Sequence, residues 1–158
     1  WGVDRLVPDC LRAFGAGRPA IIRSPLAVRP WQHVLEPLSG YLVLAEGLAG
    51  DDGQKLAPSW NFGPDHSDDA TVDEVAEMLA VAWGDDAEVL HDTDSGWMHE
   101  MATLRLDSSK ARSVLGWSPR WNLREAVEQT VAWHRAWSAG ADLRALCLDQ
   151  IADYSGSG

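Results

Sequence analysis

Two arginines, with an aromatic residue and a histidine close by, form the part of the sequence best suited to hold an anion. The segment runs Arg23-Ser-Pro-Leu-Ala-Val-Arg29-Pro-Trp31-Gln-His33, and its two prolines predict a connection rich in turns. A guanidinium group can donate two parallel hydrogen bonds to phosphate oxygens, so a pair of arginines suits a nucleotide diphosphate. For either arginine taken alone, an ordinary surface ion pair is the more common role.

A second candidate is the segment Trp97-Met-His99-Glu100, which places a titratable histidine beside a carboxylate in a polar loop. Such a pair can contact a ligand, although a histidine that is simply hydrogen-bonded or exposed to solvent is more common. The sequence has no Tyr-x-x-x-Lys pair, no glycine-rich turn after an opening strand, no serine in a nucleophile elbow and no histidines at a metal-binding helical spacing. We therefore predict no catalytic residue, no metal site and no dinucleotide cofactor site in these 158 residues.

The composition of the chain argues against several classes of binding partner and cellular location. The formal net charge of −11 would repel nucleic acid and anionic membranes, because no basic face is visible in the sequence. No run of about 18 apolar residues and no secretory signal pattern occurs, so we expect a cytoplasmic protein without a membrane span. The two cysteines, Cys10 and Cys147, lie in apolar helical patterns and are expected to be buried free thiols.

Short strands scattered among helices must position these residues. Apolar spacings of three and four predict helices, and Thr71 with Glu74 and Asn122 with Glu125 are good capping boxes. The predicted helices cover 4–14, 36–48, 71–83, 107–115, a longer segment after 122, and 142–154. The predicted strands or extended segments cover 20–23, 28–34, 59–63, 88–91 and 103–106.

These patterns together predict one helix-rich α/β unit over residues 1–154, followed by a flexible tail at 155–158. The last helix is expected to turn its apolar residues inward. These are Leu143, Leu146, Cys147, Leu148 and Ile151.

Five segments, in order and spacing, resemble the second half of the nucleotide-sugar dehydratases of the extended short-chain dehydrogenase/reductase superfamily. They lie at 1–10, 28–37, 60–64, 106–112 and 115–119, so the resemblance runs essentially from end to end. The version Arg29-Pro-Trp-Gln-His33-Val-Leu-Glu-Pro, with the closing Gly140-Ala-Asp-Leu-Arg-Ala-Leu, is similar in particular to the CDP-glucose 4,6-dehydratase family. The resemblance implies the carboxy-terminal, substrate-binding lobe of such an enzyme.

The resemblance also implies roles for individual residues. Arg29 would hold a diphosphate oxygen of CDP-glucose or a related nucleotide sugar, and Arg23 and His33 would be second contacts. The first helix would pack near the nucleotide, and a later loop would close on the nucleotide or the sugar. These substrate-binding residues are Leu6, Val7 and Pro8 in the helix, and His99 and Glu100 in the loop.

In that family a bound NAD oxidises the sugar at C4, water is lost across C5 and C6, and the hydride returns to C6. The product, CDP-4-keto-6-deoxyglucose, supplies deoxysugar and polysaccharide biosynthesis. The Rossmann core that binds NAD normally occupies the 190 to 200 residues before this pattern begins, roughly one ordinary domain. We therefore expect a lyase fragment that is inactive by itself and that leaves apolar surface uncovered near Glu36 and Trp60.

Two alternatives stay open at this point. The chain could be a non-catalytic module that still captures the nucleotide sugar. It could also be a structural domain that self-associates into a homo-oligomer, with its arginines as ordinary surface charges.

Overall fold

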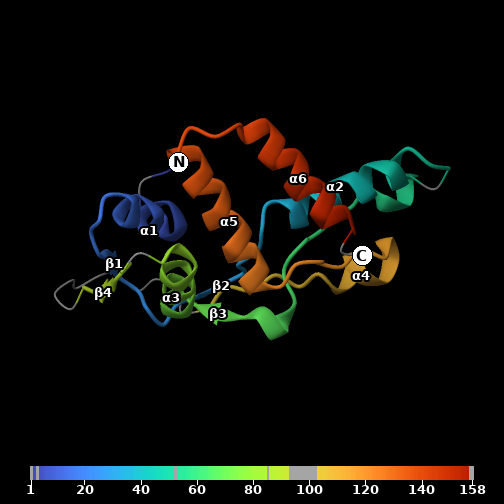
Figure 1. Ribbon diagram of the computed structural model, residues 1–158. Coiled ribbons are helices and arrows are strands. Elements are labelled where there is room, and N and C mark those ends of the chain that lie inside the picture. Colours follow the sequence, from blue (N-terminus) through green and yellow to red (C-terminus); the bar gives the residue numbers. More distant parts are fainter. Residues whose placement is uncertain (1, 3, 52, 85, 93–102, 157–158) are drawn as a thin grey trace.

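The computed structural model describes residues 2, 4–51, 53–84, 86–92 and 103–156. Three helices form its main packed layer, α1 (Leu6–Gly15), α3 (Val72–Trp83) and α5 (Leu123–Ser138). Figure 1 shows α3 below α1 and beside the lower part of α5, and both of these helices contact it. Their inward faces and the first strand enclose the larger core, made of Cys10, Leu11, Phe14, Ala20, Ile22, Ala70, Val75, Ala76, Leu79, Ala80, Leu123, Val127 and Val131.

Two small sheets accompany these helices. Strand β1 (Ala20–Ile22) pairs in parallel with β4 (Val89–His91), with Ala20 opposite Val89. Strand β2 (Val28–Arg29) pairs antiparallel with β3 (Ala70–Thr71). Since β1 packs against α1 and α3, the end of β1 and the beginning of α1 are held close together.

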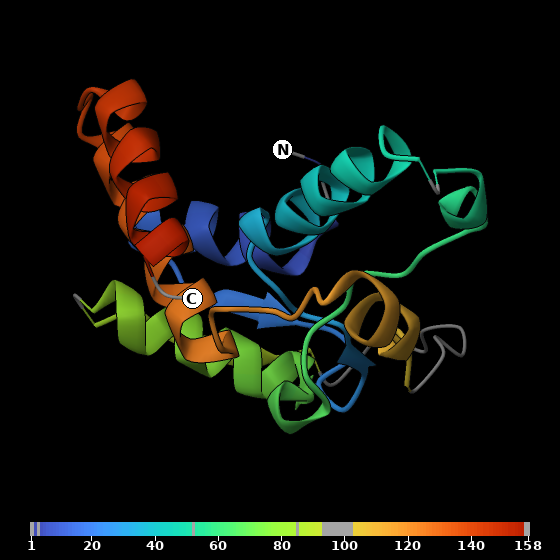
Figure 2. The ribbon, with the colours of Figure 1, turned by 90° about the vertical axis from the view of Figure 1, so that its right-hand side faces the viewer.

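The remaining helices form two extensions. Helix α6 (Leu143–Gly156) packs along α5, as Figure 2 shows. Helix α2 (Leu35–Leu48) contacts the short 3-10 helix η1 (Gly53–Leu56) and α4 (Ser109–Leu115), while a second 3-10 helix, η2 (His66–Asp68), precedes β3. A smaller core of Phe62, Ala111 and Trp117 lies in this part of the molecule.

Local sequence signals identified the starts of α3 and α5 and the end of α4. Both predicted capping boxes are formed, with the Thr71 hydroxyl accepting from the Glu74 amide and the Asn122 side chain accepting from the Glu125 amide. Gly116 ends α4 with φ 65°, a left-handed conformation that glycine adopts without steric cost. The predicted fold class, a helix-rich unit with short strands, is confirmed for the described residues.

Two predicted strands were wrong. Residues 59–63 form no strand, because side chains rather than a neighbouring strand bind their backbone: Gln32 Nε2 donates to the Phe62 carbonyl and the Ser108 hydroxyl accepts from the Gly63 amide. Residues 103–106 contribute only an isolated bridge between Thr103 and Val28. The extended segment predicted at 28–34 is a strand only at 28–29.

The last helix also differs from its prediction. It continues to Gly156, so the tail predicted at 155–158 falls partly on the helix and partly outside the described residues. Its buried residues are Gln150 and Tyr154, whereas Leu148 and Ile151 are exposed. Cys10 is buried as expected, but Cys147 is only half-buried.

Helix α2 turns apolar side chains to solvent. Its buried residues are Glu36 and Gly40, whereas Leu38, Tyr41 and Leu42 are all exposed. The uncovered apolar surface expected after Glu36 is therefore found on α2, whereas Trp60 is half-buried and packs against the smaller core. No helix within the described ranges is long and apolar enough to cross a membrane.

Candidate functional site

A cavity of about 750 Å³ lies where the beginning of α1 meets the end of β1 and strand β2. Its lining comes from segments that are distant in sequence and that the α1–β1 packing brings together. Three arginines and two aspartates line it, together with apolar side chains. The lining includes Asp4, Arg5, Leu6, Val7, Pro8, Asp9, Cys10, Arg23, Arg29 and Trp31.

The first turn of α1 forms one wall of this cavity. Arg5 is the N-cap residue, its backbone is extended, and no side chain caps the helix there. The amide groups in the first turn of a helix have no partner within the helix, and the helix dipole makes this end positive. Leu6 and Val7 supply two such amides, whereas Pro8 has none. These two amides add positive partial charge at this end of α1, while Asp9 in the same turn adds a carboxylate.

Two arginines supply positive charge from the other side. Arg23 directly follows β1, and its Nη2 atom donates a hydrogen bond to Oδ1 of Asp4. This bond, with the charge of the guanidinium, lowers the pKa of the Asp4 carboxyl group. Arg29 ends β2 and is half-buried, and its Nη1 atom donates to the Val28 carbonyl oxygen at 2.8 Å.

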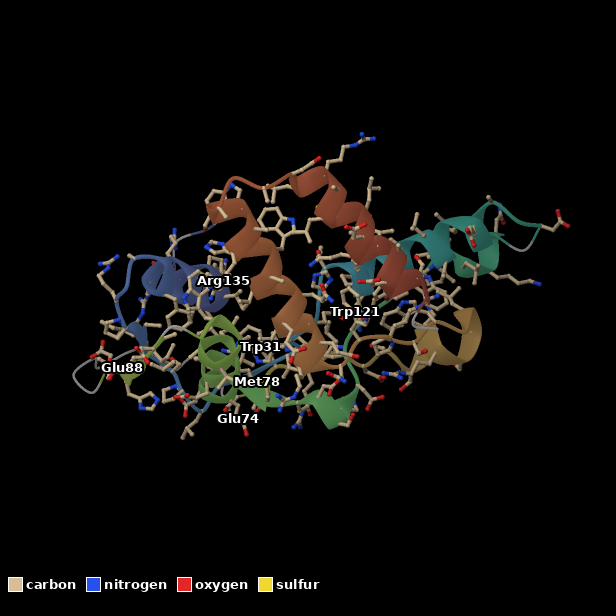
Figure 3. All side chains as sticks on the ribbon, in the orientation of Figure 1. Trp31, Glu74, Met78, Glu88, Trp121 and Arg135 are labelled. Atoms are coloured by element: carbon tan, nitrogen blue, oxygen red, sulfur yellow. The ribbon has the colours of Figure 1, made fainter. Side chains whose placement is uncertain are left out.

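Trp31 and Cys10 contribute to the apolar part of the lining. The indole nitrogen of Trp31 donates to the Ala70 carbonyl oxygen at 3.0 Å, which fixes the ring beside β3, and Figure 3 shows Trp31 next to α3. Burial raises the pKa of the Cys10 thiol to about 12, so Cys10 stays protonated and is no nucleophile at neutral pH. These two residues therefore offer packing surface rather than reactive groups.

The structure thus brings together five of the eight residues predicted to bind substrate: Leu6, Val7, Pro8, Arg23 and Arg29. His33 does not line the cavity, because its ring is buried edge-on against Trp121 with centroids 4.9 Å apart. Burial lowers the pKa of His33 to about 4, so it is neutral near pH 7. His99 and Glu100 lie outside the described residues.

Sequence reasoning did not select Asp4, Asp9, Cys10 or Trp31 as site residues. Trp31 carried a usable signal, since it follows Arg29 by two positions in the same segment. The aspartates carried none, because nothing local in the sequence tells which surface carboxylate faces a cavity.

The described residues do not fit two common cofactors. They contain no group of three or more histidine, cysteine, aspartate or glutamate residues that could hold a metal ion. A dinucleotide also finds no match, because the chain that follows β1, β2 and β3 lacks the glycine-rich turn that cradles a pyrophosphate at a helix N-terminus. The cavity instead combines three arginines and two aspartates with an apolar wall.

No protein-family model matches the chain. The chain is 47% identical over 154 residues to the CDP-glucose 4,6-dehydratase of Salmonella typhimurium (strain LT2). That alignment covers 98% of this chain and 42% of the relative, so the chain spans less than half of the relative's length. The resemblance inferred from the sequence motifs is confirmed by this similarity.

Solved structures agree on the fold. The dTDP-glucose 4,6-dehydratase of Bacillus anthracis in complex with NAD superposes with a TM-score of 0.67 at 20% identity, over 90% of this chain and 42% of that protein. The Bordetella bronchiseptica enzyme WbmF in complex with NAD+ and UDP superposes with a TM-score of 0.64 at 17% identity, over 96% of this chain and 42% of that enzyme. At these identities the likeness supports the shared fold.

Proposed function

We propose that this chain is the carboxy-terminal, nucleotide-sugar-binding lobe of a CDP-glucose 4,6-dehydratase, and that its cavity binds CDP-glucose. The supporting observation is the cavity itself. It collects, from three separate segments, five residues to which the family resemblance gives a binding role. The 47% identity to a CDP-glucose 4,6-dehydratase supports the choice of the cytidine nucleotide.

The proposed binding mode follows from the charges around the cavity. The diphosphate would lie between the positive end of α1 and the guanidinium groups of Arg29 and Arg23, which donate charge-assisted hydrogen bonds to its oxygens. The nucleoside would contact the apolar wall that includes Trp31. A net charge of −11 on the whole chain does not prevent this, because the local field at the cavity is set by the nearby arginines.

The chemical step is proposed to need residues outside these 158. NAD, which oxidises the sugar in the intact enzyme, finds no matching site among the described residues, so no step through it is assigned to this chain. His99 and Glu100 are proposed to contact the bound nucleotide sugar. His33 is proposed to support the site from the interior, because its buried ring packs on Trp121 rather than facing the cavity.

Isothermal titration of the 158-residue chain with CDP, UDP and NAD tests this proposal. We expect CDP to bind more tightly than UDP, and we expect no binding of NAD and no turnover of CDP-glucose. At a CDP concentration 100 times its Kd, binding should stabilise the folded chain by about 2.7 kcal/mol.

Arg29→Ala should weaken CDP binding at least 10-fold, because a charge-assisted contact to phosphate is lost. Arg18→Ala is the matched control, since Arg18 is an exposed arginine that does not line the cavity. Equal affinities for the wild type and Arg29→Ala would overturn the proposed site.

The apolar face of α2 favours a second role, association with another protein surface. Leu38, Tyr41 and Leu42 on that helix are exposed, and such a surface tends to be covered in the functional assembly. A homo-oligomer of this chain is one way to cover it. This role does not compete with nucleotide binding, since none of the three residues lines the cavity.

A further inference from the structure

We propose that Asp4 is an internal competitor of the ligand for Arg23, so that an anionic group binds the Nη2 edge of Arg23 only by displacing the Asp4 carboxylate. This inference rests on the proposed function, because it assumes that the cavity receives a diphosphate. It adds an autoinhibitory contact to the site.

The pair spans the opening between two elements. Asp4 lies just before the N-cap of α1, Arg23 lies just after the last residue of β1, and both line the cavity. Their hydrogen bond therefore ties the chain entering α1 to the chain leaving β1.

The carboxylate and a phosphate compete for the same donor groups. A guanidinium edge binds a carboxylate and a phosphate through the same N–H groups, so one N–H group cannot serve both fully. The Nη2 group of Arg23 already donates a hydrogen bond to Oδ1 of Asp4. A diphosphate that uses this edge must displace the Asp4 carboxylate, which is also negatively charged.

Exposure makes this contact weak enough to be displaced. The side chains of Arg23 and Asp4 retain 37% and 68% of their accessible surface, so solvent screens the pair. A diphosphate carries more negative charge than one carboxylate and also reaches Arg29 and the end of α1. The competition should therefore reduce the affinity by about 2- to 5-fold without preventing binding, as expected for an exposed ion pair.

The backbone at Asp4 dictates which variant is informative. Asp4 has φ 60°, a left-handed conformation that asparagine and aspartate tolerate better than other residues with a side chain. Asp4→Asn therefore removes the charge and keeps both the size and the backbone preference. Alanine at this position would disturb the entry into α1 as well.

The experiment is a titration of the full chain with CDP at fixed ionic strength, using the wild type, Asp4→Asn, Arg23→Gln and the double variant. We expect Asp4→Asn to bind CDP about 2- to 5-fold more tightly than the wild type. In the Arg23→Gln background the same change should give no gain, because no guanidinium remains to be released. Affinity for cytidine, which has no phosphate, should not rise.

Asp9→Asn is the matched control, since Asp9 also lines the cavity but forms its ion pair with Arg12. Its gain in CDP affinity should be smaller than that of Asp4→Asn. An equal gain from Asp4→Asn with and without Arg23, or no gain at all, would overturn the competition. If Arg29→Ala abolishes CDP binding while Asp4→Asn leaves the CDP affinity unchanged, only this inference fails. If neither the wild type nor Asp4→Asn binds CDP, the proposed function fails as well.

Discussion

The hydroxyl group of Tyr154 donates a hydrogen bond of 2.7 Å to the carboxylate of Glu36, joining residues 118 positions apart in the chain. Glu36 is completely buried at the start of α2, and its oxygens also accept from the backbone amides of Arg120 and Trp121. Burial raises the pKa of Tyr154 to about 12, so its hydroxyl remains a donor near neutral pH. This network connects the start of α2, the segment before α5 and the end of α6.

Glu36→Gln should lower the free energy of unfolding by about 2–4 kcal/mol. The carboxylate accepts hydrogen bonds from surrounding N–H and O–H groups, and the NH2 group of glutamine cannot accept them. Urea denaturation followed by tryptophan fluorescence measures the change. Tyr154→Phe is the comparison: it removes one donor while the backbone donors of Arg120 and Trp121 stay in place, so it should cost less, about 1.5 kcal/mol. A Glu36→Gln protein within about 0.5 kcal/mol of the wild type would show that the network adds little to stability.

Gly40→Ala should destabilise the chain by about 1–3 kcal/mol through overpacking. A Cβ atom at Gly40 would lie 2.2 Å from Cδ1 of the Phe62 ring, which is itself buried against Trp117. Gly47→Ala in the same helix is the comparison, since the added atom there meets only the flexible end of Leu56. Thermal unfolding should show a clearly lower Tm for Gly40→Ala than for Gly47→Ala; equal Tm values would contradict the close packing of α2 on Phe62.

Stability should fall as the pH is lowered from about 6.5 to about 4, because buried His33 must be protonated on unfolding. Its pKa is near 6.5 in the unfolded chain and about 4 in the folded protein, so the unfolded state binds the proton first. The stabilisation from the neutral ring is complete above pH 6.5, and about 3 kcal/mol of it is lost by pH 4.

Urea midpoints measured across this pH range, for the wild type and His33→Gln, test the assignment. The variant should show a shallower pH dependence, although some should remain because burial also lowers the pKa of His134. Identical slopes for the two proteins would mean that His33 is not the group responsible.

Leu42→Lys should reduce self-association without lowering stability, because Leu42 is 67% exposed on the apolar face of α2. Sedimentation velocity at several protein concentrations measures the oligomeric state. Val81→Lys is the matched control, since Val81 is 75% exposed on α3, away from that face. If the two variants and the wild type sediment alike at every concentration, the α2 face does not mediate association between copies of this chain.

The sequence by itself determined the features that depend on neighbouring residues. The capping boxes at Thr71 and Asn122 and the stop at Gly116 involve groups within a few positions of one another, so their types and spacing were sufficient. The segment at 23–29 was also identified as a candidate anion site from its own residues. The family motifs added the first turn of α1 to that site.

Only the tertiary structure decided which of these residues share a site. Packing of α1 on β1 places Asp4 beside Arg23, and burial against Trp121 takes His33 away from the cavity. The same is true of Glu36, which looks like an ordinary surface carboxylate in the sequence and is fully buried through partners 84 to 118 positions away. Hydrogen bonds and burial act between atoms that are close in space, and a linear pattern records only which residues are close along the chain.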